Sequence, residues 1–276
     1  MVECLEVSRS GYYNWLNRSK SQRDVDDEYF KSRIRHYFDK SEQTYGVERI
    51  YRDLKAEGLK IGKSRVSRLM KEMGLVAVAR KKFKVTTDSN HNKEVAPNLL
   101  AQDFSADYPD QVWVGDISYI WTQEGWLYLA VVLDLFSRKI VGWGLSDRLK
   151  RGLVIDAFKM AVVNRKPPAG LIFHSDKGSQ YCSNEFKRAV GKAGAVQSMS
   201  GTGNCYDNAA CESFFHTIKV ERLHRFLFMT RAAAERCVFQ YIEVFYNRKR
   251  RHSYTGYISP DAFERNYYIS NLGKCG

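Results

Sequence analysis

The sequence predicts an α/β protein, in which a mixed five-stranded sheet is flanked by helices and preceded by an all-α helix-turn-helix segment. Residues 26–74 show helical periodicity that is broken only by short turns. Residues 112–146 contain three consecutive β-rich runs separated by short breaks, which is typical of an antiparallel meander. After residue 152, helical and β-rich segments alternate, as they do where helices cover a mixed sheet.

The first 75 residues are expected to form a helical DNA-binding region. A mixed-charge helix over 26–38 is followed by two helices over 47–58 and 63–74, which are separated by a short glycine turn. Helix, short turn and helix form the helix-turn-helix outline. Its second helix presents the basic residues Lys63, Arg65 and Arg68, which we expect to contact DNA phosphates. A solvated basic face on an ordinary helical hairpin is the alternative.

Residues 76–105 show neither helical nor strand periodicity and are rich in Lys, Arg, Thr and Asn. We interpret them as a basic linker. We expect a core domain over 106–230 and a C-terminal helix with a basic tail over 231–276. The elements expected in the core are strands over 112–120, 126–136, 139–146, 171–175 and 195–200, with helices over 152–166 and 184–194 and a further helix that carries Glu212. One long helix is expected from about Thr230 to Tyr246, ending in a basic run.

The composition is that of a folded protein, with 276 residues of which 44% are hydrophobic and 13% aromatic. No apolar run reaches the roughly 20 residues that span a bilayer, so we expect a cytoplasmic protein without a membrane partner. The six cysteines are scattered without a CxxC pair, which favours reduced thiols. A zinc site could combine Cys205, Cys211, His216 and His224, but their spacings are wider than those of ordinary structural sites.

The net charge of +13 favours a polyanionic partner, although many basic soluble proteins share such a bias. Residues 1–100 carry 21 basic and 14 acidic side chains, residues 101–230 carry 15 and 13, and residues 231–276 carry 8 and 4. The excess of positive charge therefore lies at both ends of the chain.

Three acids occupy positions where a sheet would hold them rigidly. Asp116 interrupts a run of β-formers, and alternation places it on the strand face shared by Val112 and Val114. Asp176 directly follows an apolar strand, where open α/β sheets usually present ligand-binding groups, although Asp-Lys-Gly could equally be a plain turn. Glu212 lies on the helix after a glycine-rich loop. Asp116 and Asp176 are separated by 59 intervening residues, and Asp176 and Glu212 are separated by 35.

In this order, five segments match one known pattern: WVGDISYI, GWLYLAVVLDLFSRKIVGW, HSDKGSQYCS, MSGTGNCYDNAACESFFHTIKVE and YNRKRRHSYTGYISP. The chain resembles the catalytic core of the retroviral-integrase superfamily of DDE enzymes, which has a ribonuclease H-like fold. More narrowly, it is similar to the OrfB transposases of bacterial insertion sequences, over nearly its whole length. The sequence departs from that family at Gly115, where we expect Thr, at Lys177, where Arg is commoner, and at Gly201, where many members have Arg.

The resemblance implies a catalytic triad of Asp116, Asp176 and Glu212 that holds two Mg²⁺ ions, for which Mn²⁺ can substitute, with Asp116 bridging both ions. It implies cleavage at the ends of an insertion sequence and transfer of the freed 3′-OH to target DNA. Besides the helix-turn-helix residues, the expected DNA contacts are Lys177, Asn208, His216, Lys219, Arg248, Lys249, Arg250 and Arg251. We also expect Glu212 to be poorly placed until DNA and metal are bound.

Partners implied by the resemblance are insertion-sequence end DNA, target DNA, further copies of the chain on DNA, and an OrfA protein or fusion from an upstream frame. The setting would be the nucleoid of a bacterial cytoplasm. Two alternatives stay open: a ribonuclease H-like nuclease without strand transfer, and a non-catalytic DNA-binding regulator.

Overall fold

The computed structural model describes residues 8–78, 96–100, 105–200 and 209–272. The chain divides into two compact units, Met1–Val78 and Ala79–Gly276, and each is described here by itself. The sequence segment 231–276 belongs to the second unit. Among the described residues, no helix is long and apolar enough to cross a membrane.

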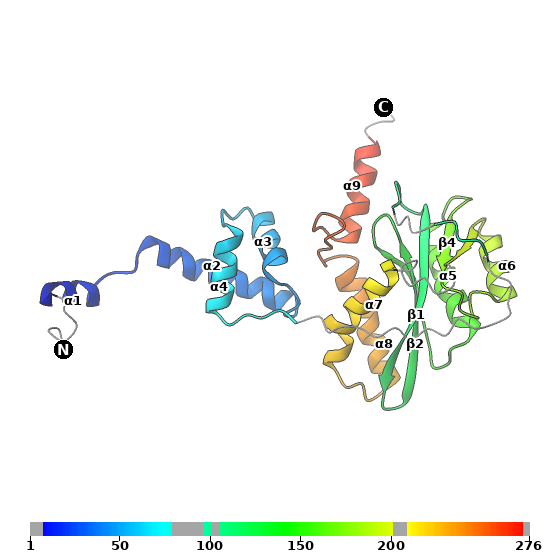
Figure 1. Cartoon of the computed structure of the whole chain (residues 1–276), viewed down its shortest axis with the longest axis horizontal. Coiled ribbons are helices and arrows are strands. Elements are labelled where there is room, and N and C mark those ends of the chain that lie inside the picture. The colour runs from blue at the N-terminus through cyan, green and yellow to red at the C-terminus, as the bar shows by residue number, and fades with distance from the viewer. Residues whose placement is uncertain (1–7, 79–95, 101–104, 201–208, 273–276) are drawn as a thin grey trace. The chain divides into compact units, whose positions relative to one another are not determined.

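The first unit contains four helices in its described part: α1 (Arg9–Leu16), α2 (Gln22–Lys40), α3 (Val47–Ala56) and α4 (Lys63–Glu72) (Figure 1). Ser21 caps the start of α2 and forms a capping box with Asp24, which satisfies free amides in the first turn of the helix. Apolar side chains from α2, α3 and α4 meet in one core, which includes Ile34, Ile50 and Leu69. The helix-turn-helix arrangement predicted from the sequence is therefore confirmed.

The second unit is built on a five-stranded sheet with the strand order β3-β2-β1-β4-β5. Its strands are β1 (Val112–Thr122), β2 (Gly125–Asp134), β3 (Ile140–Ser146), β4 (Ile172–Ser175) and β5 (Val196–Met199). β1, β2 and β3 form an antiparallel meander, whereas β4 is parallel to β1 and β5 is parallel to β4. This topology confirms the predicted mixed sheet of the ribonuclease H-like type.

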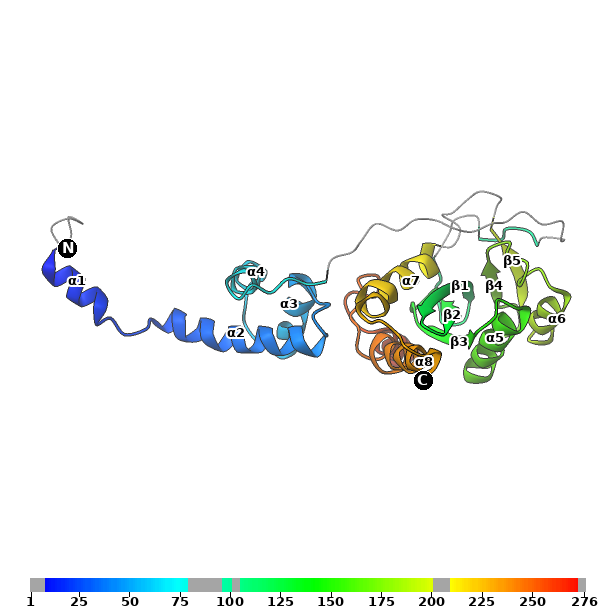
Figure 2. The ribbon, with the colours of Figure 1, turned by 90° about the horizontal axis from the view of Figure 1, so that it is seen from below.

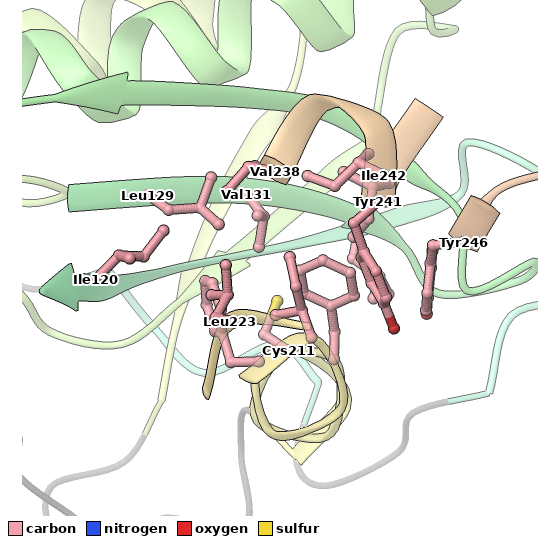
Figure 3. Packing of buried hydrophobic residues seen from close by; sticks show 14 of the residues in the cluster. Ile120, Leu129, Val131, Cys211, Leu223, Val238, Tyr241, Ile242 and Tyr246 are labelled. Atoms are coloured by element: carbon pink, nitrogen blue, oxygen red, sulfur yellow. The ribbon is translucent and has the colours of Figure 1, made fainter. Parts of the chain in front are cut away.

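Helices cover both faces of the sheet. Figure 2 shows α5 (Arg151–Arg165) and α6 (Asn184–Lys192) on one side, and α7 (Ala209–Glu221) and α8 (Arg231–Phe239) on the other. Two separate cores result, because alternate residues of each strand face opposite sides. Figure 3 shows the core beneath α7, in which Val131 of β2 and Cys211 of α7 pack with Tyr241 and Ile242.

The long helical segment predicted from Thr230 to Tyr246 is present, but it changes from an α-helix to a π-helix part-way along. The α-helix α8 ends at Phe239, and the chain continues as the π-helix η4 (Gln240–Tyr246). The amide of Asn247 bonds the carbonyl of Ile242, five residues earlier, and the wider turn keeps Tyr246 buried on the same side as Tyr241. A short 3₁₀ turn, η3 (Leu223–Arg225), follows α7.

The helix α9 (Pro260–Leu272) was not predicted from the sequence, and buried ion pairs fasten it to the sheet unit. Arg165 at the end of α5 bonds Asp110 through Nε at 2.8 Å and Glu264 of α9 through NH1 at 2.8 Å. The hydroxyl oxygen of Ser137 lies within hydrogen-bond distance of two carboxylates, 2.7 Å from Glu264 and 2.8 Å from Asp134. Contacts with α5 and with the segment that follows β2 thereby hold α9 in place.

Candidate active site

The first two acids lie beside each other where β4 ends against the middle of β1. β4 pairs with β1 from Val112 to Gly115, which lies opposite Ser175, the last residue of β4. Asp116 and Asp176 are the next residues of these two strands. β4 ends opposite Gly115 whereas β1 continues to Thr122, so the register sets Asp176, the residue after β4, next to Asp116.

The third acid comes from α7, which packs along the face of β1 that carries Val114. The thiol of Cys211 lies 3.5 Å from the carbonyl oxygen of Val114, which fixes the start of the helix against the strand. Phe214 and Ile218 are buried on this side, as the sequence predicted. Glu212 lies on the exposed side of the same turn.

The three carboxylates share one electrostatic environment. Burial raises the pKa of Asp116 well above its ordinary value, and the negative charges of Asp176 and Glu212 raise it further. Tyr181, buried in the core below, has its pKa raised well above the ordinary value by burial, with added effects of Asp116 and Asp176. Partial burial raises the pKa of Glu212. The fold thus places three carboxylates near one another, and a bound cation would offset the repulsion between them.

Lys219 on α7 interacts electrostatically with Asp116. Its side chain is buried and its Nζ lies 4.9 Å from the centre of the Tyr119 ring on β1. Burial lowers the pKa of Lys219, while the carboxylate of Asp116 opposes that change. The ammonium group therefore lies between the acid cluster and the aromatic side chains farther along β1.

Backbone bonds orient both strand acids. Oδ1 of Asp176 accepts a hydrogen bond from the amide of Gly178 at 2.9 Å, which closes the turn after β4. Oδ1 of Asp116 accepts from the amide of Ile117 at 2.7 Å. The turn foreseen at Asp176 is thus present, and it holds the carboxylate at the strand end.

The donor set is chemically suited to Mg²⁺, because that ion prefers carboxylate oxygens and retains several waters. The repulsion between Asp116 and its two acidic neighbours is the structural observation that fits a cation here. Within the described residues, no three His, Cys, Asp or Glu side chains are arranged closely enough to hold a metal ion. The proposed zinc site includes Cys205, outside the described residues, and its Cys211 is fully buried.

All three predicted phosphate-binding residues on α4 form ion pairs within the helical unit. Asp27 of α2 pairs with Arg65 at 2.7 Å and with Arg68 at 2.6 Å. Arg68 also pairs with Glu72 in the next turn of its own helix. Lys63 at the start of α4 is largely exposed, although it pairs with Glu48.

The C-terminal basic run divides into exposed and buried residues. Arg248 and Lys249 are exposed, and Arg251 donates to the carbonyl of Tyr257 at 2.7 Å. Arg250 is only 2% exposed and binds both carboxylate oxygens of Glu221 at 2.7 Å. This burial contradicts the prediction that Arg250 contacts DNA, because its guanidinium is enclosed by the core instead.

Two of the remaining predicted contacts, Lys177 and His216, follow Asp176 and Glu212 closely in the chain. Lys177 follows Asp176 in the turn and is partly exposed, as is His216 on α7. Asn208 lies outside the described residues. The sequence reasoning did not single out Tyr181 or Glu221, although both stand inside the motifs that carried the family resemblance.

The mixed five-stranded sheet and its flanking helices are those of an integrase-type core, the fold of a class of polynucleotidyl transferases. Family models agree: an integrase core domain matches residues 106–205, an HTH-like domain matches 24–83, and a second integrase core domain model matches 212–267.

The chain is 46% identical over 268 residues to an uncharacterized 31 kDa protein of insertion element IS600 from Shigella sonnei, covering 97% of this chain and 98% of that protein. It is 43% identical over 266 residues to the transposase InsF of insertion sequence IS3A from Escherichia coli (strain K12), covering 96% and 92%. The chain therefore belongs to the family of insertion-sequence transposases with an integrase core, enzymes of DNA transposition.

Solved structures with a similar fold include two integrase catalytic cores. The HTLV-2 integrase core in complex with magnesium matches with a TM-score of 0.45 and 18% identity, covering 57% of this chain and 97% of that one. The BIV integrase core matches with a TM-score of 0.44 and 14% identity, covering 59% and 99%.

Proposed function

We propose that this transposase cleaves DNA at the ends of an insertion sequence and joins the freed 3′-OH to a second phosphodiester, with Asp116, Asp176 and Glu212 as the catalytic residues. The observation that supports this most strongly is the grouping of the three acids: the register of β1 and β4 sets Asp176 next to Asp116, and burial raises the pKa of Asp116, with the charges of Asp176 and Glu212 adding to that effect.

The three carboxylates would hold two Mg²⁺ ions, or Mn²⁺ in their place. When bound, such ions activate the attacking oxygen and stabilise the leaving oxygen of an in-line displacement. In the first step, water attacks the phosphorus atom, and the bond to the 3′-oxygen of the element end breaks. In the second step, that 3′-oxygen attacks a target phosphodiester, one P–O bond forms and one breaks, and no oxidant or energy source is consumed.

DNA binding would be divided between the two units. In the helical unit, Lys63 is the exposed candidate for a phosphate contact, with Arg65 and Arg68 beside it. Near the acids the proposed contacts are Lys177, His216 and Lys219, and at the C-terminal side they are Arg248, Lys249 and Arg251; Asn208, also proposed, lies outside the described residues. A reaction that joins two DNA ends to one target supports an oligomer on DNA, with an OrfA protein or fusion as a further partner.

A strand-transfer assay tests the proposal. Duplex DNA that ends in the element's own terminal sequence, labelled at the transferred strand, is incubated with the full chain, a plasmid target and Mg²⁺. We expect labelled products longer than the substrate from the wild type and none from Asp116→Asn or Glu212→Gln. Cleavage products that never join to target DNA would instead identify a nuclease, and binding without either product would identify a regulator.

A further inference from the structure

The turn after β4 contains a glycine whose backbone conformation does not require glycine. Gly178 lies two residues after Asp176, and its φ is outside the left-handed range. Gly170 and Gly194, which flank the same strand and helix, have φ values of +89° and +68° and do need the freedom of glycine. An alanine could therefore adopt the backbone of Gly178, and the reason for a glycine lies in the space around it.

The carboxylate of Asp176 occupies that space. A Cβ atom at residue 178 would lie 2.9 Å from Oδ1 of Asp176 and 3.6 Å from its Cγ, with Oε1 of Gln180 at 3.4 Å. The first of these distances is well below the separation at which non-bonded atoms attract one another. A side chain at residue 178 and the carboxylate in its observed position therefore exclude each other.

The backbone of the turn is fixed to the core and cannot move aside easily. The carbonyl of Gly178 accepts hydrogen bonds from the amides of Tyr181 at 3.0 Å and Cys182 at 3.2 Å. Both of these side chains are buried in the core on the side of α5 and α6. The amide of Gly178 in turn donates to Oδ1 of Asp176 at 2.9 Å. The group that yields to an added Cβ is thus the end of the Asp176 side chain.

A different glycine shows the opposite case. A Cβ at Gly142 of β3 would lie 2.3 Å from the carbonyl oxygen of Ala157 and 2.7 Å from the amide nitrogen of Ala161. Both are backbone atoms of α5, so a substitution at Gly142 must shift a helix and costs stability. At Gly178 the obstacle is the tip of one side chain, so the same substitution changes the direction of a carboxylate and spares the packing.

We propose that Gly178 is a positioning residue for Asp176. Its amide holds one carboxylate oxygen, and its lack of a side chain leaves the space that the carboxylate needs beside Asp116. This proposal rests on the function proposed above, because it concerns the direction in which Asp176 meets a divalent ion. Changing a group that orients a metal ligand typically lowers metal affinity or activity by about 10- to 100-fold.

Urea unfolding separates this role from a structural one. The full chain is compared as wild type, Gly178→Ala and Gly142→Ala. The urea midpoint of Gly178→Ala is expected to equal that of the wild type or to exceed it slightly, because alanine restricts the unfolded chain. The midpoint of Gly142→Ala is expected to fall. A Gly178→Ala midpoint as low as that of Gly142→Ala would overturn the proposal, because the glycine would then serve the fold of the turn.

Binding of Mn²⁺ reports the direction of the carboxylate without any reaction. The full chain is bound to an element end that terminates in a 2′,3′-dideoxynucleotide and cannot be joined, and unbound Mn²⁺ is followed by electron paramagnetic resonance. Gly178→Ala is expected to bind Mn²⁺ about tenfold more weakly or worse, with unchanged DNA affinity in the absence of metal. Gly191→Ala on α6, where an added Cβ meets no described atom within 4 Å, is expected to bind like the wild type. Equal Mn²⁺ affinity of Gly178→Ala and the wild type would overturn the proposal.

Strand transfer across a series of Mg²⁺ concentrations distinguishes this proposal from the proposed function. Gly178→Ala is expected to need about tenfold more Mg²⁺ than the wild type for half-maximal joining. A wild type that binds Mn²⁺ more tightly than Gly178→Ala but never joins DNA would defeat only the strand-transfer proposal. A Gly178→Ala variant that joins DNA with the Mg²⁺ dependence of the wild type would defeat only the positioning role.

Discussion

The ring of Phe173 on β4 occupies the space in which a side chain at Gly115 of β1 would stand. A Cβ atom at residue 115 would lie 2.5 Å from Cζ of that ring. Phe173 cannot move away readily, because it is buried against Phe158, Phe186 and Tyr181. This packing explains why Gly replaces the expected Thr one residue before the first acid.

Gly115→Thr is therefore expected to destabilise the sheet unit by about 1–3 kcal/mol, the usual cost of overpacking. Phe173→Leu in the same chain is expected to recover part of this loss. Unfolding by urea measures both effects. As a control, Gly191→Ala on α6, where an added Cβ meets nothing within 4 Å, should leave stability equal or slightly higher.

Arg250→Met is expected to destabilise the protein by about 3–5 kcal/mol, because it leaves the buried carboxylate of Glu221 without its cation. Tyr241, which donates to Glu221 at 2.7 Å, cannot replace that charge. Thermal unfolding of Arg250→Met beside the exposed Arg248→Met provides the measurement. Equal melting temperatures for the two variants would refute a structural role for Arg250.

In the helical unit, Lys63→Ala is expected to weaken DNA binding and to reduce the salt dependence of the affinity by about one counterion, with little effect on stability. Asp27→Asn should instead lower stability by about 1–3 kcal/mol, because it removes the partner of Arg65 and Arg68. Affinity measured across a salt series, together with urea unfolding of each variant, separates the two roles. An unchanged salt slope for Lys63→Ala would exclude its phosphate contact.

Asp134 is expected to titrate near neutrality, because burial raises its pKa from 3.8 to about 6. A folded-state pKa above the unfolded one means that the folded state binds the proton more tightly. The contribution of Asp134 to stability is thus complete below about pH 3.8 and is lost as the pH rises through about 6. The carboxyl carbon resonance of Asp134 reports the midpoint directly, and a midpoint near 4 would contradict this account.

The same titration predicts the pH dependence of Asp134→Asn. The variant loses one acceptor at every pH, since its amide cannot accept from both the Asp110 and Ser137 amides that the carboxylate binds. The stability advantage of the wild type over the variant should therefore shrink between pH 4 and pH 6.

The sequence predicted those features that depend on local pattern. Strand alternation placed Asp116 on the face of Val114, and helical spacing placed Phe214 and Ile218 against the sheet; the structure confirms both placements. The family resemblance, rather than any local pattern, connected the three acids, because strand pairing across 59 intervening residues leaves no local signal.

Predictions failed or stayed incomplete where a distant partner decides the outcome. Arg250 belongs to a basic run that favours DNA, but its partner Glu221 lies 29 residues away and draws it into the core. Asp27, which engages Arg65, lies 38 residues from it. Helical periodicity also gave no sign of the π-helix, because the burial of both Tyr241 and Tyr246 is a property of the tertiary core.

The central claim is that Asp176 belongs to a catalytic carboxylate site for strand transfer, and Asp176→Asn tests it most directly. The variant is compared with Asp156→Asn, which changes an exposed acid on α5. In Mg²⁺ with the element's own ends, the account predicts that Asp176→Asn loses joining by about a hundredfold or more while DNA affinity and stability remain, and that Asp156→Asn joins like the wild type. Strand transfer at the wild-type rate by Asp176→Asn would contradict the account.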